Sequence, residues 1–219
     1  MDALPIAASA DVHRADAARE IVSVCRRLYM AGLIAGQDGN VSVRIAPEVI
    51  LITPAGLSKV DVREADLVEL DACGGVRGEG ARSSEFEMHV RIYARRPDVG
   101  AVVHAHPPVA TGFGVAGLDF MDDVLPETIF QMGGVPLVPY AAPGTSALGD
   151  ALEPYLLAHD AFLLANHGAT TIGPSLLIAH QRMESLEHAA RIVHTARTLG
   201  RVNTLAPHEA DALRAARKH

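Results

Sequence analysis

Short apolar runs alternate with longer segments of helical periodicity along the chain, and this pattern limits the fold more than any other feature. Strands are expected where the runs are short, at 41–45, 49–53, 67–70, 100–106, 135–138 and 161–165. Helices are expected where apolar residues recur at helical spacing, at 11–33, 82–96, 147–159, 174–200 and 207–218. Interleaved strands and helices predict an α/β layered domain. Because no linker or repeat divides the 219 residues, we expect one domain over residues 1–219.

Charge and cysteine content exclude several classes of protein. The formal net charge of −7 argues against binding to nucleic acid or to anionic membranes. The chain contains no run of apolar residues long enough for a transmembrane helix, and residues 1–11 lack the regions of a signal peptide. Cys25 and Cys73 are the only cysteines, so no disulfide framework is expected. We therefore expect a cytoplasmic protein.

Three histidines at strand ends predict a metal site. His104 and His106 stand two residues apart in the run Val102-Val103-His104-Ala105-His106, so they project from the same face of a strand. His167 follows a second apolar run, where Gly168 permits a sharp turn. A single histidine in such a place is more often a solvated residue, so the prediction depends on the three together. Three imidazoles can hold a divalent metal and leave positions open for a substrate.

Three further segments are candidates for anion binding. Arg82-Ser83-Ser84-Glu85 begins a predicted helix, and Ser84 and Glu87 have the spacing of a capping box. The amides of such a helix start can bind phosphate, and Glu85 in the first turn can act as a metal ligand or a base. Gly39 with Asn40, and Gly56, tolerate turns that direct backbone amides inward. Each segment alone is equally typical of an ordinary cap or turn.

Taken in order, five segments resemble the class II aldolase/adducin family, and within it the L-fuculose-1-phosphate aldolases. The segments are GQDGNVSVR, LITPAGLSKV, RSSEFEMHVRIYARRPDVGAVVHAHPP, GGVPLVPYAAPGT and LLANHGATTIG. The resemblance implies a three-layer α/β/α fold around a central mixed, mainly antiparallel sheet. It also implies a homotetramer with the site near a subunit boundary, so that a neighbouring chain can contribute a residue.

The same resemblance implies roles for individual residues. The metal, zinc first and manganese or another divalent ion as alternatives, would be held by His104, His106, His167 and Glu85. Glu85 would also serve as the acid–base when substrate displaces it. The phosphate of a small sugar would be bound by Gly39, Asn40, Gly56, Ser83 and Ser84. We expect cleavage of a small ketose or deoxyketose 1-phosphate to dihydroxyacetone phosphate and an aldehyde.

Two departures from the family pattern keep other reactions open. Ala55 stands where the family often has a hydroxyl residue of the phosphate loop, and Glu127 stands where the fuculose-phosphate enzyme has a tyrosine acid. Glu127 is a second proton-transfer candidate, with a buried or interface carboxylate as its structural alternative. The alternative function is a decarboxylase or dehydratase acting on a sugar-acid or methylthio-ketose phosphate.

An adducin-like module without catalysis would have lost the metal ligands. The residues Phe113, Phe120 and Phe130 suggest an apolar substrate tail.

Overall fold

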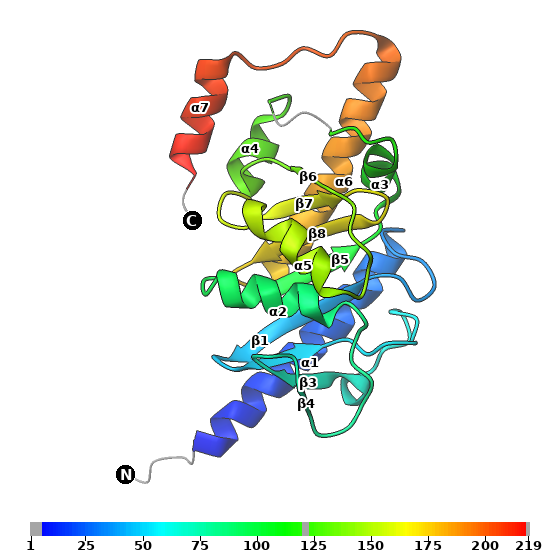
Figure 1. The fold of residues 1–219 in the computed structure, drawn as a ribbon, viewed down its shortest axis with the longest axis vertical. Helices are drawn as coiled ribbons and strands as arrows, with labels where there is room; N and C mark the ends of the chain where they lie inside the picture. Colours follow the sequence, from blue (N-terminus) through cyan, green and yellow to red (C-terminus); the bar gives the residue numbers. More distant parts are fainter. Residues whose placement is uncertain (1–5, 120–122, 218–219) are drawn as a thin grey trace.

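The predicted strands form one sheet in the computed structural model, which describes residues 6–119 and 123–217. Within those residues the sheet has eight strands in the order β4-β3-β2-β1-β5-β8-β7-β6 (Figure 1). Neighbouring strands pair antiparallel except β6 and β7, which are parallel, so the expected mixed, mainly antiparallel sheet is confirmed. The strands are β1 (Asn40–Ala46), β2 (Val49–Ile52), β3 (Val68–Asp71), β4 (Val76–Arg77), β5 (Ala101–Ala105), β6 (Leu137–Val138), β7 (Ala161–Leu164) and β8 (Gly168–Gly173).

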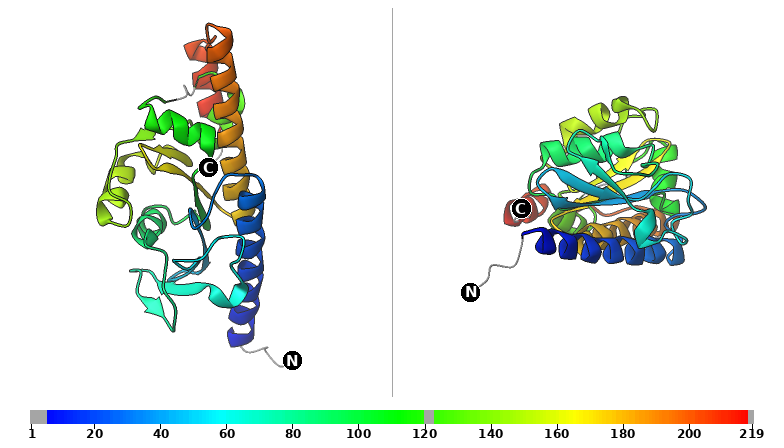
Figure 2. Two further views of the ribbon diagram at one scale, coloured as in Figure 1. Left: turned by 90° about the vertical axis from the view of Figure 1, so that its right-hand side faces the viewer. Right: turned by 90° about the horizontal axis from the view of Figure 1, so that it is seen from below.

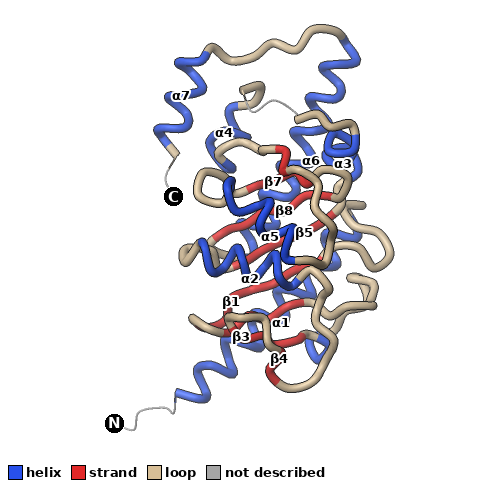
Figure 3. The backbone as a smooth tube through the Cα atoms, viewed as in Figure 1, coloured by secondary structure: helices blue, strands red, loops and turns tan. Residues whose placement is uncertain are grey.

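Helices cover both faces of the sheet, which confirms the three-layer arrangement (Figure 3). One face carries α1 (Ile6–Met30) and α6 (Leu176–Leu199), which follow one another along the sheet in Figure 2. The other face carries α2 (Phe86–Arg95) and α5 (Ser146–Leu152). Successive residues of β5 face opposite layers: Val103 packs in the core with α1 and α6, whereas Val102 packs in the core with α2 and α5. His104 therefore points toward the layer of α2.

The start of α2 differs from the sequence prediction. The helix begins at Phe86 instead of near residue 82, and no side chain caps it, so the predicted capping box of Ser84 and Glu87 was wrong. The reason is an isolated β-bridge between Pro54 and Arg82, which keeps the preceding segment extended. As a result, the two serines and Glu85 lie before the helix, with Ser84 and Glu85 in a turn.

Several elements were absent from the prediction or shorter than predicted. The helices α3 (Pro108–Val115) and α4 (Pro126–Met132) were not predicted, and neither was β8, which lies between β5 and β7. The predicted helix over 147–159 divides into α5 and the 3-10 turn η2 (Glu153–Tyr155), because proline at 154 supplies no amide hydrogen to continue it. A second 3-10 turn is η1 (Glu64–Asp66), and α7 (Pro207–Ala216) ends the described chain. No helix within residues 6–119 and 123–217 is both long and apolar enough to cross a membrane.

Candidate metal centre and active site

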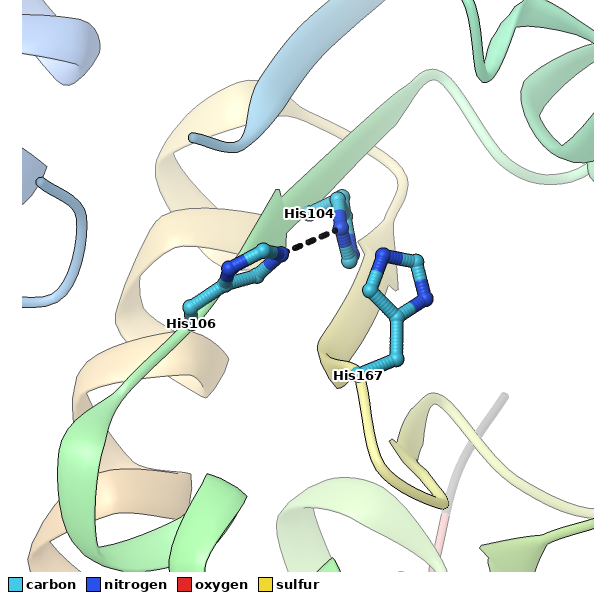
Figure 4. A group of neighbouring side chains, drawn as sticks. All are labelled: His104, His106 and His167. Atoms are coloured by element: carbon cyan, nitrogen blue, oxygen red, sulfur yellow. Dashed lines mark hydrogen bonds between the residues drawn. The ribbon is translucent and has the colours of Figure 1, made fainter. Parts of the chain in front are cut away.

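Three histidines from two segments that are distant in sequence meet beside the central strands (Figure 4). His104 lies on β5, His106 follows the end of that strand, and His167 lies in the turn between β7 and β8. Their potential ligand nitrogens all lie within 4.8 Å of one another. Asn166 adopts a left-handed φ of 54° in the turn, and the lack of a side chain at Gly168 leaves space for the His106 ring. The turn chemistry thus directs His167 toward the other two rings.

The carboxylate of Glu85 lies against two of these histidines. Its Oε2 atom is 3.2 Å from His104 Nε2, and its Oε1 atom is 3.0 Å from His167 Nε2. Burial opposes the negative charge of Glu85, but the two imidazoles outweigh this effect and hold the pKa of the carboxyl well below its usual range. The buried Oε1 atom accepts no hydrogen bond. Glu85 is therefore an ionised carboxylate with a free lone pair directed at the histidine cluster.

The hydrogen bonds of His104 determine which of its nitrogens faces the cluster as a ligand. Its Nδ1 atom is 3.0 Å from the carbonyl oxygen of Ala169, which can only accept, so Nδ1 carries the proton. Nε2 is therefore the nitrogen that is available to a metal, and it lies 3.2 Å from His106 Nε2 and 3.2 Å from Glu85 Oε2. Burial, together with repulsion from the other two imidazoles, lowers the pKa of His106 to about 4. Imidazole nitrogens and a carboxylate that converge at such distances form a donor set that suits a divalent cation.

A buried chain of polar groups runs from Glu85 into the core. Asn40, opposite His104 in the pairing of β1 with β5, donates from Nδ2 to Glu85 Oε2 at 2.8 Å. The other amide atom, Oδ1, pairs with His89 Nε2, and His89 Nδ1 lies 2.7 Å from the Ser42 hydroxyl. The Ser42 hydroxyl in turn lies 2.8 Å from the hydroxyl of Tyr93. All four groups are buried.

The donor and acceptor in each of these hydrogen bonds can be assigned by starting from the Glu85 carboxylate. A carboxylate only accepts, so Asn40 donates to Glu85 with its amide nitrogen and accepts from His89 Nε2–H with its oxygen. His89 Nδ1 must then accept from Ser42, and Ser42 accepts from Tyr93. Burial lowers the pKa of His89 to about 3, which agrees with a neutral ring. Sequence reasoning missed this chain, although Glu85, His89 and Tyr93 recur at i, i+4 spacing along one helical face.

A hollow of about 380 Å³ opens in front of the cluster. Its polar lining includes all the residues predicted to bind phosphate, together with Glu85 and two of the histidines. The lining consists of Gln37, Asp38, Gly39, Asn40, Pro54, Ala55, Gly56, Lys59, Ser83, Ser84, Glu85, His106, Pro143 and His167. Gly39 and Gly56 both adopt positive φ, at 73° and 77°, which is the backbone conformation that glycine favours. Lys59 is the lining residue with a positive charge that sequence reasoning did not single out.

Other predicted residues lie outside this hollow. Glu127 is exposed near the start of α4 and does not line it. Phe113 lines a separate hollow of about 410 Å³ with Leu118 and Arg197, and Phe130 is 48% exposed. Phe120 lies outside the described residues. Within one chain, therefore, neither Glu127 nor the two described phenylalanines line the hollow in front of the histidines.

Comparison with known proteins gives one consistent group of relatives. Residues 19–194 match the family described as "Class II Aldolase and Adducin N-terminal domain". The chain is 33% identical over 180 residues to a 3-oxo-tetronate 4-phosphate decarboxylase of Pectobacterium atrosepticum, covering 80% of this chain and 82% of the relative. It is 36% identical over 172 residues to a 5-methylthioribulose-1-phosphate/5-deoxyribulose-1-phosphate aldolase of Rhodospirillum rubrum, covering 78% and 76%.

A solved structure gives the same result for the fold. The structure named L-fuculose 1-phosphate aldolase superposes with a TM-score of 0.85 at 30% sequence identity. The match covers 91% of this chain and 95% of that chain. The similarity therefore includes both the sheet and the helices that surround the histidine cluster.

Proposed function

Because the chain belongs to the class II aldolase and adducin family, we propose that it is a metal-dependent lyase that breaks a carbon–carbon bond in a small phosphorylated sugar. The observation that supports this most directly is the apposition of three imidazoles and the ionised Glu85 beside an open hollow. The first reaction that we propose is the cleavage of a ketose 1-phosphate, such as a 5-deoxypentulose or 6-deoxyhexulose phosphate, to dihydroxyacetone phosphate and an aldehyde.

In this proposal, His104, His106, His167 and Glu85 hold the metal, and zinc is the first choice because it accepts nitrogen and carboxylate ligands. The bound ion supplies Lewis-acid stabilisation of the negative charge that develops on the substrate oxygens. The Ala169 carbonyl fixes the ring of His104 in the required tautomer. His106 Nδ1 lies 3.5 Å from the carboxylate of Asp38, which can orient the second ring in the same way.

Glu85 is the proposed acid–base. Cleavage removes a proton from the hydroxyl of the leaving aldehyde carbon, and the electrons of the broken bond remain on the ketone fragment as an enediolate. Because Glu85 is ionised, it would first take up a proton from water once the substrate has displaced it from the ion. It would then pass that proton to the carbanion carbon of the ketone fragment, for which its Oε1 atom is placed beside the cluster. Asn40 holds the other oxygen at 2.8 Å and so limits rotation of the carboxylate.

The phosphate of the substrate would occupy the polar end of the hollow. Ser83 and Ser84 immediately precede α2, and they line the hollow together with the turns at Gly39 and Gly56. Backbone amides and hydroxyls in such an arrangement bind anions without a cation of their own. Contacts to this remote group supply binding energy that can be used at the reacting carbon.

Glu127 enters the proposal through a neighbouring copy of the chain. Its carboxylate is exposed and lies outside the hollow of its own chain, so it can reach substrate only if another subunit presents it. We therefore propose a homotetramer in which Glu127 handles the hydroxyl proton of the aldehyde fragment. Mixing Glu85→Ala and Glu127→Ala subunits tests this, since roughly a quarter of the sites in an equal random mixture would be intact. No recovery of activity in the mixture would exclude a role in trans.

The principal test is a coupled assay for dihydroxyacetone phosphate with a panel of ketose 1-phosphates, after the metal content of each preparation has been measured. Wild type should release product in proportion to bound metal, and Glu85→Gln should retain metal poorly and lose activity. Glu87→Gln, a neighbouring carboxylate in the first turn of α2, is the matched control. A metal-loaded enzyme that releases no dihydroxyacetone phosphate from any substrate would refute the aldolase reaction.

Decarboxylation is the second candidate, and the 3-oxo-tetronate 4-phosphate decarboxylase relative favours it. A 3-oxo acid loses carbon dioxide when the electrons of the broken bond pass to the neighbouring carbonyl, so the same cluster can serve both reactions. Loss of carbon dioxide needs no proton acceptor on an aldehyde fragment. Release of carbon dioxide from a 3-oxo sugar-acid phosphate that persists in Glu127→Ala would favour this candidate over the aldolase.

A further inference from the structure

Lys59 lies between the two glycine turns of the hollow. Its side chain is only 3% exposed, although lysine is rarely buried without a specific partner. The ammonium nitrogen donates to the carbonyl oxygens of Gln37 and Leu57, each at 2.9 Å. Gln37 precedes Gly39 and Leu57 follows Gly56, so this single group joins the two turns.

The contacts of Lys59 leave part of its ammonium group available. An ammonium group has three N–H donors, and within the described chain only two of them are used. Both acceptors are uncharged carbonyl groups, so no carboxylate neutralises the lysine by direct contact. Burial lowers the pKa of Lys59, while the negative charges of Asp38 and Glu85 act in the opposite direction.

The charged side chains that line the hollow are unbalanced for a phosphorylated ligand, although the proposed metal would add positive charge at its histidine end. Among the described residues that line it, Asp38 and Glu85 are acidic, and Lys59 is the only lysine or arginine. A phosphate dianion would add two further negative charges. The backbone amides and serine hydroxyls contribute only dipoles, and Ala55 contributes no polar side-chain group at all.

We propose that Lys59 is a binding residue for the phosphate group: it joins the two glycine turns and supplies the positive charge that the rest of the lining lacks. This inference rests on the proposed function for the identity of the anion. It predicts that the protein discriminates phosphorylated from unphosphorylated ligands through Lys59. The effect belongs to binding, so it should change the Michaelis constant for a phosphorylated substrate more than it changes kcat.

Calorimetric titration of the metal-loaded protein with inorganic phosphate tests the inference without any turnover. Lys59→Gln keeps amide donors for the two carbonyls but removes the charge, and Lys59→Arg keeps the charge. Arg63→Gln is the matched control, because it removes one positive charge from an exposed side chain outside the hollow. Lys59→Gln should bind phosphate roughly ten- to a hundredfold more weakly, as expected for one charged hydrogen-bond partner. Lys59→Arg should recover much of the affinity, and Arg63→Gln should match wild type.

Two further readouts separate charge from a merely structural role. The phosphate affinity of wild type should fall with ionic strength, and this dependence should be weaker in Lys59→Gln. Unphosphorylated dihydroxyacetone should bind both proteins equally, and their metal contents should agree. Phosphate binding within twofold of wild type in Lys59→Gln, or an equal loss of dihydroxyacetone binding, would overturn the inference. If Lys59→Gln does not fold, Lys59→Arg decides: retained phosphate affinity supports the inference and its loss refutes it.

The outcome for Lys59 is separable from the outcome for the reaction. Lysine-dependent phosphate binding in a protein that cleaves no sugar phosphate would leave the inference intact and refute the proposed reaction. If Lys59→Gln cleaves the phosphorylated sugar with the same Michaelis constant as wild type, the proposed reaction is supported and the inference about Lys59 is refuted.

Discussion

Replacing His89 with leucine tests the buried polar chain that ends on Glu85. The imidazole is fully buried and is bonded on one side to Asn40 and on the other to Ser42. Leucine would leave the Asn40 oxygen without a donor and the Ser42 hydroxyl without an acceptor. Each orphaned buried group costs about 1–3 kcal/mol, so the free energy of unfolding should fall by roughly 2–6 kcal/mol. Asn40 would also be free to rotate, so kcat should fall with the loss of Glu85 orientation.

Tyr93→Phe is the matched control, because it removes a single hydroxyl at the far end of the same chain. Ser42 keeps its bond to His89 in that variant, so the expected loss is only about 1 kcal/mol. Urea unfolding followed by circular dichroism at one protein concentration would measure both variants. The reasoning is refuted if His89→Leu lies within 1 kcal/mol of wild type, or if the two variants lose the same stability while kcat is unchanged in both.

Three further predictions follow from the same contacts. The pKa of His89 is about 3 in the folded protein against 6.5 for the free group, so the unfolded state binds one more proton between these values. Stability should therefore fall by about 1.4 kcal/mol per unit as pH decreases below 6.5, and His89→Leu should lack this contribution in a urea series against pH. Removing metal with a chelator should lower the melting temperature, since metal at a hundred times its Kd stabilises by about 2.7 kcal/mol; His104→Ala should show no such response in calorimetry. Gly56→Ala should lower the free energy of unfolding by roughly 1 kcal/mol, because alanine is strained at a positive φ. Gly39→Ala should lower it clearly more, because the added Cβ would also lie 2.7 Å from the carbonyl oxygen of His104. Equal losses of stability in urea unfolding would contradict this prediction.

The strand that carries His104 and ends just before His106 could be predicted because two local signals agree there. An apolar run fixes the strand, and its two-residue period places both imidazoles on one side. The fold class followed similarly from the alternation of elements. The proline-initiated helices α3 and α4 escaped prediction because proline is usually a sign of a loop, although it is well accepted in the first turn.

The support around Glu85 could not be predicted, because it depends on contacts between distant segments. His89 is a core residue by periodicity, and only the pairing of β1 with β5 brings Asn40 and Ser42 to it. Lys59 follows a glycine turn like many exposed lysines, and its burial becomes evident only when the two turns approach each other. The place of Glu127 depends on how copies of the chain assemble, which local patterns do not encode.

The strand order has a consequence for the order of events in folding. The cluster needs β1, β5 and β8 paired side by side, and the contact between His104 and Thr170 alone closes a separation of 66 residues. Closing such long loops is slow, and no short fragment of the chain contains the complete ligand set. Partly folded chains would thus offer the ion at most the neighbouring pair His104 and His106. An ion that binds after the last strands have paired should leave the rate of folding unchanged. It should instead slow unfolding, and so stabilise the completed sheet kinetically.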